Sequence, residues 1–320
     1  MRRLSCLVPA LCLSCAGADG KGGEEDDPST EPLALLLVWD RSASMAEEAF
    51  ALAQAVPALN AGLERRPDTL VAVTTNTAYA TDGDTLHPGE GGTLVGPVVN
   101  TSDAGWPRAL TEQILCRATD WYGTDVPRDA SYVCEEGAPP PDVVSEEYLD
   151  CLCGDGLWEF TPAGAGQEEH LESILLTLCR AADPPIAACA DPLSVWDATR
   201  DQTLSGWPDG RPVHVLMASD EGDDSRRMSQ SDPDPTEAYV RPIEALAPGA
   251  TVSALIPVLD PDTGDVPCNN AGTPTWSISR LLETVASTGG RAFPVAREDA
   301  DGECAPADFG EVMGAWVAGL

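Results

Sequence analysis

The apolar run LALLLVW at residues 33–39 is the strongest fold signal in the chain, and it ends abruptly at Asp40. An apolar run without polar alternation is typical of a strand buried on both faces, as in a parallel sheet covered by helices. Ser42 and Ser44 follow at alternate positions. The sequence therefore predicts a buried strand that presents one carboxylate and two hydroxyls at its exit.

Further apolar runs alternate with helical patterns along the chain. We expect strands at 69–77, 211–220, 251–259 and 291–295, and helices at 43–66, 168–182, 235–247, 276–290 and 305–320. Pro57 is expected to kink or end the first helix. Such alternation predicts an α/β fold with a mostly parallel sheet and helices on both faces. Asp40 and Asp220, which both follow strands, would lie beyond the same end of that sheet, where ligands bind in this architecture.

The N-terminal segment has the layout of an export signal. Residues 1–14 contain two arginines, a short apolar stretch and small residues, and that stretch is too short to span a bilayer. The sequence around Cys15 resembles a degenerate bacterial lipobox, which implies lipidation of Cys15, with plain secretion as the alternative. Residues 15–32 are rich in Gly, acids and Pro, and we expect them to form a flexible acidic tether before a domain at 33–320.

The cysteines favour an oxidising compartment. Of eleven cysteines, eight lie beyond the leader, and an even set in an exported chain predicts up to four disulfides, with zinc as a weaker alternative. A Cys268–Cys304 pair is predicted, because these residues flank the last helix and strand. Cys151 and Cys153 are too close to pair with each other, so each is expected to have a distant partner. The remaining candidates, whose pairing stays open, are Cys116, Cys134, Cys179 and Cys189, and residues 101–160 are expected to be an irregular, disulfide-stapled insertion.

The charge of the chain limits its partners. With 53 acidic and 18 basic residues, the formal net charge is −35. Such a chain repels nucleic acid and anionic membranes, so we expect no nucleic-acid partner, and membrane contact only through an N-terminal lipid anchor. The same charge favours divalent cations.

Asp40, Ser42 and Ser44 form a D-x-S-x-S pattern, and Asp220 lies in the segment ASDEGDDS. Hard divalent cations take several oxygen ligands at about 2.0–2.6 Å, and these include carboxylates, hydroxyls and water. An acid and two hydroxyls at alternate positions of a turning loop can point inward together, and a distant aspartate would complete the cup. Two other acidic segments, 260–265 and 223–225, lack a regular calcium-loop spacing and are expected to be solvated loops. The sequence ATDG at 80–83 is expected to be a turn.

These residues resemble the von Willebrand factor type A (VWA) family and its metal-ion-dependent adhesion site (MIDAS). D-R-S-A-S matches the first loop of that site, and S-D-E-G matches the third, with Asp220 at the aspartate position. The resemblance covers roughly residues 33–320 and is specific at these two loops. It implies a Rossmann-like doubly wound fold, binding of Mg²⁺ or Ca²⁺, with Mn²⁺ as a third candidate, and a protein partner whose acidic or other oxygen-donor group completes the coordination.

The chain departs from the family pattern at the loop that usually supplies a threonine. Glu168 stands at that position, in a G-x-G-x-E run that resembles a variant of exported bacterial members. Glu168 is therefore a candidate ligand, directly or through water. The alternative is a glutamate in the first turn of a helix, where it would stabilise the helix dipole.

The leading functional hypothesis is an exported, surface-tethered, metal-dependent binding module of the cell envelope that is not an enzyme. One alternative is a structural or assembly subunit whose metal site has decayed. Another is a metal-dependent phosphoester hydrolase, which would need a second aspartate where Ser42 stands and a downstream lysine, whereas Lys21 is the only lysine. We find no GxSxG, P-loop or GxGxxG motif opening a helix.

Overall fold

The computed structural model describes residues 30–320, except 83–84, 89–90, 136–137, 155, 161–167, 191–203, 205, 230–231, 233, 258–267, 269–274 and 299–303. The proposed signal at 1–14, Cys15, nearly all of the tether and the acidic loop at 260–265 lie outside the described residues. Within the described part, no helix is both long and apolar enough to cross a membrane.

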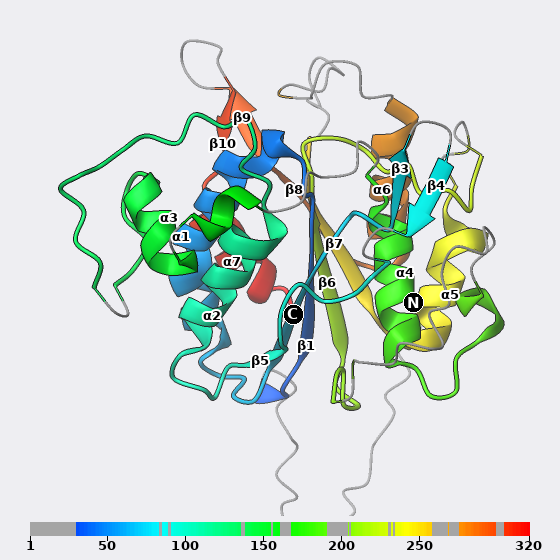
Figure 1. Ribbon diagram of the computed structural model, residues 1–320. Coiled ribbons are helices and arrows are strands. Elements are labelled where there is room, and N and C mark those ends of the chain that lie inside the picture. Colours follow the sequence, from blue (N-terminus) through cyan, green and yellow to red (C-terminus); the bar gives the residue numbers. More distant parts are fainter. Residues whose placement is uncertain are drawn as a thin grey trace, which may run out of the picture.

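A six-stranded sheet forms the centre of the molecule (Figure 1). Its strands are β1 (Ala34–Trp39), β2 (Leu70–Thr75), β5 (Val99–Asn100), β6 (Val213–Ala218), β7 (Thr251–Ile256) and β8 (Ala292–Pro294). They lie in the order β5-β2-β1-β6-β7-β8, and every pairing is parallel except that of β5 with β2. This is the order of a Rossmann-like doubly wound sheet, and the predicted fold class is confirmed.

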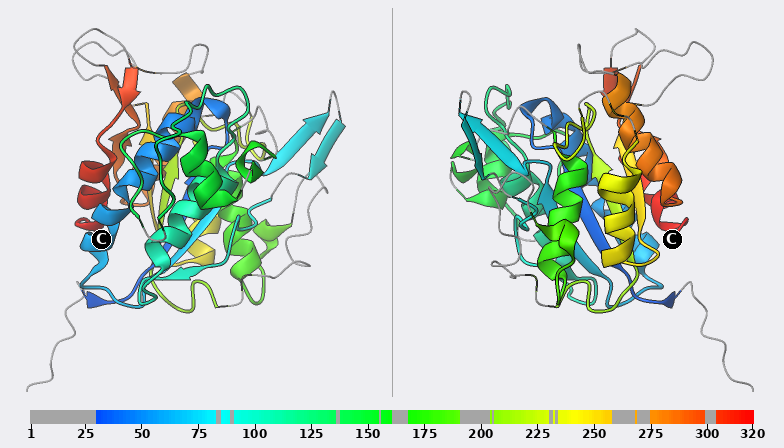
Figure 2. Two further views of the ribbon diagram at one scale, coloured as in Figure 1. Left: turned by 60° about the vertical axis from the view of Figure 1, so that its left-hand side comes forward. Right: turned by 90° about the vertical axis from the view of Figure 1, so that its right-hand side faces the viewer.

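Helices cover both faces of the sheet (Figures 1 and 2). One face is covered by α1 (Ala46–Leu63), α2 (Trp106–Gln113), α3 (Glu146–Cys153) and α7 (Phe309–Val317), and the other by α4 (His170–Ala181), α5 (Arg241–Leu246) and α6 (Thr275–Ser287). Along β1, Leu35 and Leu37 pack into the first layer, whereas Leu36 and Val38 pack into the second. The alternation of side chains along a strand thus explains why the run at 33–39 has no polar residue.

The remaining elements are short. A hairpin of β3 (Tyr79–Asp82) and β4 (Thr85–Pro88) projects from the body in Figure 2. The prediction of a turn at 80–83 is wrong for residues 80–82, which belong to β3 and pair with β4, while residue 83 lies outside the described residues. A second small antiparallel pair is formed by β9 (Ala296–Glu298) and β10 (Cys304–Pro306). Single turns of 3₁₀ or π helix lie at Ala43–Met45, Ile114–Ala118, Leu157–Phe160, Ala187–Cys189 and Thr236–Val240.

Pro57 does not end the first helix, as one of the two predicted alternatives required, because α1 continues to Leu63. Pro57 is exposed, while its neighbours Ala53, Val56 and Leu59 are buried in the core. Tertiary packing of an apolar helix face contributes more to helix stability than local propensity, and it holds the helix together across the proline.

The insertion at 101–160 is less irregular than predicted, because it contains α2 and α3. Its expected disulfides are present as Cys116–Cys153 and Cys134–Cys151, so the two cysteines of the CLC segment each have a distant partner. The predicted Cys268–Cys304 disulfide is present too. The fourth disulfide joins Cys179 in α4 to Cys189.

Candidate functional site

Asp40 and Asp220 follow two neighbouring strands at the point where the sheet changes winding direction. β1 and β6 pair in parallel, with Trp39 opposite Ala218. The Asp40 amide donates to the Ala218 carbonyl at 2.9 Å, so the two chains still lie side by side as they leave the sheet. Crevices beyond the carboxyl ends of strands at such a switch point are where doubly wound folds bind ligands.

The D-x-S-x-S loop folds around the Asp40 carboxylate, which is fully buried. Oδ1 accepts from the Ser42 amide at 2.9 Å, and Oδ2 accepts from the Ser219 hydroxyl at 2.6 Å. The hydroxyls of Ser42 and Ser44 are 2.9 Å apart. Neither serine caps a helix with its side chain, and α1 begins only after Met45. The loop therefore presents two hydroxyls beside a fixed carboxylate.

Asp220 belongs to the same group of side chains. Burial raises the pKa of Asp220 to about 6, and the charge of Asp40 adds to this effect, whereas a hydrogen bond from Ser44 opposes it. Oδ1 of Asp220 is buried and has no hydrogen-bond partner among the described residues. The structure thus brings together the four residues that the sequence predicted from two separate loops.

Glu168 lies in the segment that leads into α4, and its side chain is buried. Burial is the main cause that raises the pKa of Glu168 to about 10, and the charges of Asp40 and Glu221 contribute to this rise. Since α4 begins at His170, Glu168 precedes the helix, and the alternative of a first-turn glutamate is wrong. Glu168 faces the same acidic cluster as Asp40.

Glu48 is a site residue that the sequence reasoning missed, because acids early in a helix are commonly explained by the helix dipole. Burial raises the pKa of Glu48 to about 7, with smaller contributions from Asp220, Glu47 and Asp40. Its Oε2 atom is buried and has no hydrogen-bond partner within the described part of the chain. Glu48 follows Ser44 by four residues, but this spacing does not show which side of α1 is turned toward the site.

The segment that follows Asp220 holds α4 in place. Asp223 Oδ1 accepts from the Leu171 amide at 3.0 Å, and Ser225 Oγ accepts from the Glu172 amide at 3.0 Å. Asp223 also pairs with Arg280 of α6 at 3.3 Å, and both side chains are at most 1% exposed. The expectation that 223–225 is a solvated loop is therefore wrong, because the buried Asp223 carboxylate accepts from the first turn of α4 and compensates the charge of Arg280.

Gly222 is the residue that allows this segment to pack against α6. A Cβ atom at Gly222 would overlap the Ser277 side chain and lie 2.8 Å from the Ser277 carbonyl carbon. Only glycine fits such an approach of backbone to helix. The position of Asp220 therefore depends on close packing two residues further along the chain.

Several carboxyl groups lie close together at the site, and the buried Arg41 lies between Asp40 and Ser42 in the sequence. Every charged group that perturbs the pKa values of Glu48, Glu168 and Asp220 is another carboxylate. Within the described ranges, no group of three or more His, Cys, Asp or Glu side chains is arranged to hold a metal by itself. The donor set at Asp40 is instead mixed carboxylate and hydroxyl oxygen, which is the chemistry of a hard divalent cation with water or partner ligands.

Comparisons with known proteins give similarity in structure only. No family model and no curated protein matches the sequence. A von Willebrand factor type A structure from Catenulispora acidiphila is 12% identical, with a TM-score of 0.41, over 90% of this chain and 42% of that chain. The pilus adhesin SpaC from Lactobacillus rhamnosus GG is 10% identical, with a TM-score of 0.41, over 90% and 30%. Human COPII-coat protein Sec24c is 10% identical, with a TM-score of 0.34, over 82% and 30%. This chain spans less than half of each, and similarities at this level do not bear on its activity.

Proposed function

We propose that the chain is an exported, surface-tethered binding module of the VWA type. It holds Mg²⁺ or Ca²⁺ at Asp40, Ser42, Ser44 and Asp220, with Glu168 at the edge of the site, and Mn²⁺ is a third candidate cation. It recognises a protein partner through an oxygen donor that completes the coordination of the cation. The module performs no catalysis.

The observation that carries this proposal is the gathering of buried carboxyl groups at the strand ends. Asp40 and Asp220 come from neighbouring strands and are linked to the serines of both loops by hydrogen bonds. Asp220 Oδ1 and Glu48 Oε2 are buried without a hydrogen-bond partner among the described residues. Buried carboxyl groups that lack hydrogen bonds and adjoin other carboxyl groups either take up protons or are compensated by a cation, and a bound cation displaces those protons.

Each residue has a distinct part in this proposal. Asp40, held by Ser42 and Ser219, supplies a carboxylate whose orientation is fixed, while Ser42 and Ser44 supply neutral oxygens. The cation, when bound, supplies a positive centre that attracts an acidic group of the partner. The partially exposed Ser42 and the exposed Ser44 place this centre where a partner can reach it.

Thermal unfolding with added Mg²⁺, Ca²⁺ or Mn²⁺, at constant ionic strength, tests the cation site. A ligand at a hundred times its Kd stabilises the folded state by about 2.7 kcal/mol, which is a rise in Tm of several degrees. Asp40→Asn keeps the acceptor atom for Ser42 but removes the charge, and should abolish the rise. Asp125→Asn is the matched control, because Asp125 is exposed. A wild-type curve that no cation moves would refute the proposal.

A second measurement separates the binding module from the alternative functions. A partner captured on the immobilised protein should be released by EDTA and recovered by excess Mg²⁺, and Asp40→Asn should not capture it. Capture that is unchanged by EDTA and by Asp40→Asn would favour the structural subunit with a decayed site. Phosphoester turnover that is lost in Asp40→Asn would favour the hydrolase.

A further inference from the structure

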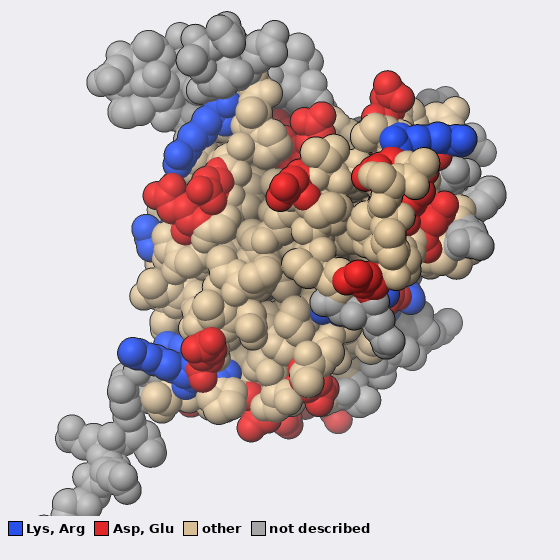
Figure 3. All heavy atoms as spheres, turned by 90° about the vertical axis from the view of Figure 1, so that its left-hand side faces the viewer, with Lys and Arg blue, Asp and Glu red and all other residues tan. Residues whose placement is uncertain are grey.

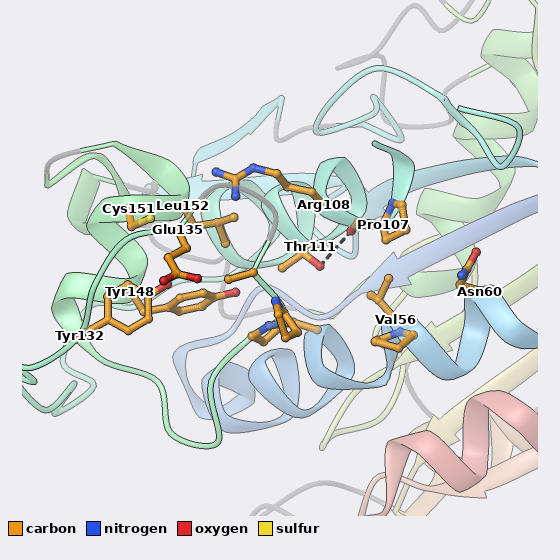
Figure 4. Close-up of a pocket in the computed structure, with 15 residues that line it drawn as sticks. Val56, Asn60, Pro107, Arg108, Thr111, Tyr132, Glu135, Tyr148, Cys151 and Leu152 are labelled. Atoms are coloured by element: carbon orange, nitrogen blue, oxygen red, sulfur yellow. Dashed lines mark hydrogen bonds between the residues drawn. The ribbon is translucent and has the colours of Figure 1, made fainter. Parts of the chain in front are cut away.

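A cavity lies in the layer of α1, α2 and α3, away from the strand-end site (Figure 4). Its volume is about 240 Å³, and its walls come from α1, α2, the loop before α3 and α3 itself. Cavities of about 150 Å³ already accommodate a benzene ring. The cavity is therefore large enough for a ring with a short side chain.

The walls of this cavity are mainly apolar and fixed in place. Four prolines line it, and they are Pro57, Pro107, Pro139 and Pro140. The Gln54 amide of α1 donates to the Pro141 carbonyl at 2.7 Å, which fastens the proline segment to the helix. The Cys134–Cys151 disulfide ties the loop to α3. Rigid, apolar walls are characteristic of preformed small-ligand sites.

Polar groups meet at one side of the cavity. The Tyr148 ring packs edge-on against Phe50 and Tyr132, and the residue is only 4% exposed. Arg108 and Tyr148 both line the cavity, and burial raises the pKa of Tyr148, Tyr132 raises it further, and the charge of Arg108 lowers it. Figure 4 shows Arg108 extending from α2 along one wall and the Tyr148 ring along another.

Arg108 is half-buried and, among the described residues, has neither an ion pair nor a hydrogen bond. This is unusual in a chain with 53 acids and 18 bases. Glu135 lies at the rim and is exposed, but it does not pair with Arg108. The hydroxyl of Tyr148 also has no hydrogen-bond acceptor in the described part of the chain. The cavity therefore offers a guanidinium and a phenol as donors, and neither is paired with Glu135 or with another described residue.

The face of the molecule that these helices form carries few charged side chains in its middle (Figure 3). Figure 3 shows the face of α1, α2, α3 and α7, where side chains other than Lys, Arg, Asp and Glu cover most of the middle. Arginine binds carboxylates through paired, charge-assisted hydrogen bonds, and the half-buried Arg108 has a guanidinium available for such a partner.

We propose that this cavity binds a monocarboxylate on a ring-sized apolar body, with the carboxylate against Arg108 and Tyr148 and the apolar body against the prolines. The ligand is either a free aromatic acid or the C-terminal residue of a peptide, since both carry the same chemistry. The Glu135 carboxylate at the rim disfavours a second negative charge on the ligand.

The test is an NMR titration of the full chain, observing the ring signals of Tyr132 and Tyr148. Three probes share one ring and differ in charge: 3-phenylpropanoate, 3-phenylpropanol and 3-phenylpropylamine. The acid should bind with a saturable shift, and the alcohol and the amine should bind at least about tenfold more weakly, because each lacks the charge-assisted bond. Acetyl-Gly-Gly-Phe, compared with its C-terminal amide, distinguishes a peptide terminus from a free acid.

Two variants complete the experiment. Arg108→Gln keeps most of the side-chain length and should weaken binding of the acid at least about tenfold. Arg117→Gln is the matched control, because Arg117 is exposed and pairs only with Glu112 at the surface, and it should bind as wild type does. Equal binding of acid and alcohol, an undiminished affinity in Arg108→Gln, or no saturable shift with any probe would each overturn the proposal. The cation response of the strand-end site should not change in either variant.

Discussion

Asp223→Asn is the substitution that tests most directly how the candidate site is held together. The wild-type carboxylate accepts from the Leu171 amide at 3.0 Å and the Ser225 hydroxyl at 2.7 Å, and pairs with Arg280 at 3.3 Å. Asparagine preserves the volume and one acceptor oxygen, so the cap on α4 can persist. The substitution removes the negative charge that compensates the guanidinium of Arg280, whose side chain is only 1% exposed.

The expected loss of stability follows from this burial. Removing one member of a buried ion pair costs about 3–5 kcal/mol, because the remaining charge has no compensation. Arg280 keeps hydrogen bonds to the carbonyls of Ser229 and Asp232, so we place the loss at the lower end, near 3 kcal/mol. For a domain of this size, that is a fall in Tm of roughly 10 °C.

Urea unfolding, followed by tryptophan fluorescence and circular dichroism, measures this loss. Arg241→Gln is the matched control, since its partner Glu237 lies four residues away on an exposed helical turn, and such pairs contribute about 0.3–0.5 kcal/mol. The double variant Asp223→Asn with Arg280→Met should recover part of the loss, because it removes the uncompensated charge. A single variant as stable as the control, or a double variant with simply additive losses, would refute this account of the ion pair.

Three further changes have defined outcomes. Gly222→Ala should lower the free energy of unfolding by about 1–3 kcal/mol, because its Cβ meets Ser277, and should weaken the rise in Tm with Mg²⁺. Burial lowers the pKa of His214 to about 4, so protonation is disfavoured in the folded state, and the free energy of unfolding should fall by up to about 3 kcal/mol as the pH drops from 6.5 to 4. His214→Gln should flatten this dependence in urea titrations at each pH. Replacing Cys268 and Cys304 by serine opens a loop with a sequence separation of 36, and should lower the urea midpoint by the equivalent of about 4 kcal/mol.

Each of these three predictions would be contradicted by a specific result. A Gly222→Ala protein with the same Tm as the wild type would show that the segment around residue 222 can move away from α6. A His214→Gln protein with the wild-type slope between pH 6.5 and 4 would assign the acid sensitivity to other groups. A serine double variant with an unchanged urea midpoint would show that the loop closed by the disulfide is ordered without it.

The pairing of Asp40 with Asp220 could be predicted because it depends only on topology. Exits of neighbouring parallel strands meet at one edge whatever the loops do, and the apolar runs before these two residues defined the strands. Glu168 could be placed near the site by counting back from its helix, but its exclusion from the first turn required the observed start of α4 at His170.

The misses concern residues whose role depends on distant packing. Glu48 faces the site because of how α1 rotates onto the sheet, which no local pattern defines. Asp223 looks solvated in a segment rich in acids, yet its partner Arg280 lies 57 residues further along, in α6. Pro57 breaks helices in isolation, whereas here the core on the opposite side of α1 maintains the helix. The oxygen-bearing residues at the strand ends could thus be predicted from the local sequence, whereas the further acids near them depend on tertiary packing.

The direction of β1 has a practical consequence for any device built on this protein. The strand enters the sheet at Ala34 and delivers Asp40 at the opposite edge, and its six residues span about 20 Å (Figure 1). A linker fused ahead of β1 therefore lies at the far pole from the acidic cluster. Immobilisation on a sensor chip or bead through that flank leaves the cluster facing solution, whereas coupling through carboxylates would consume the groups that are to be measured.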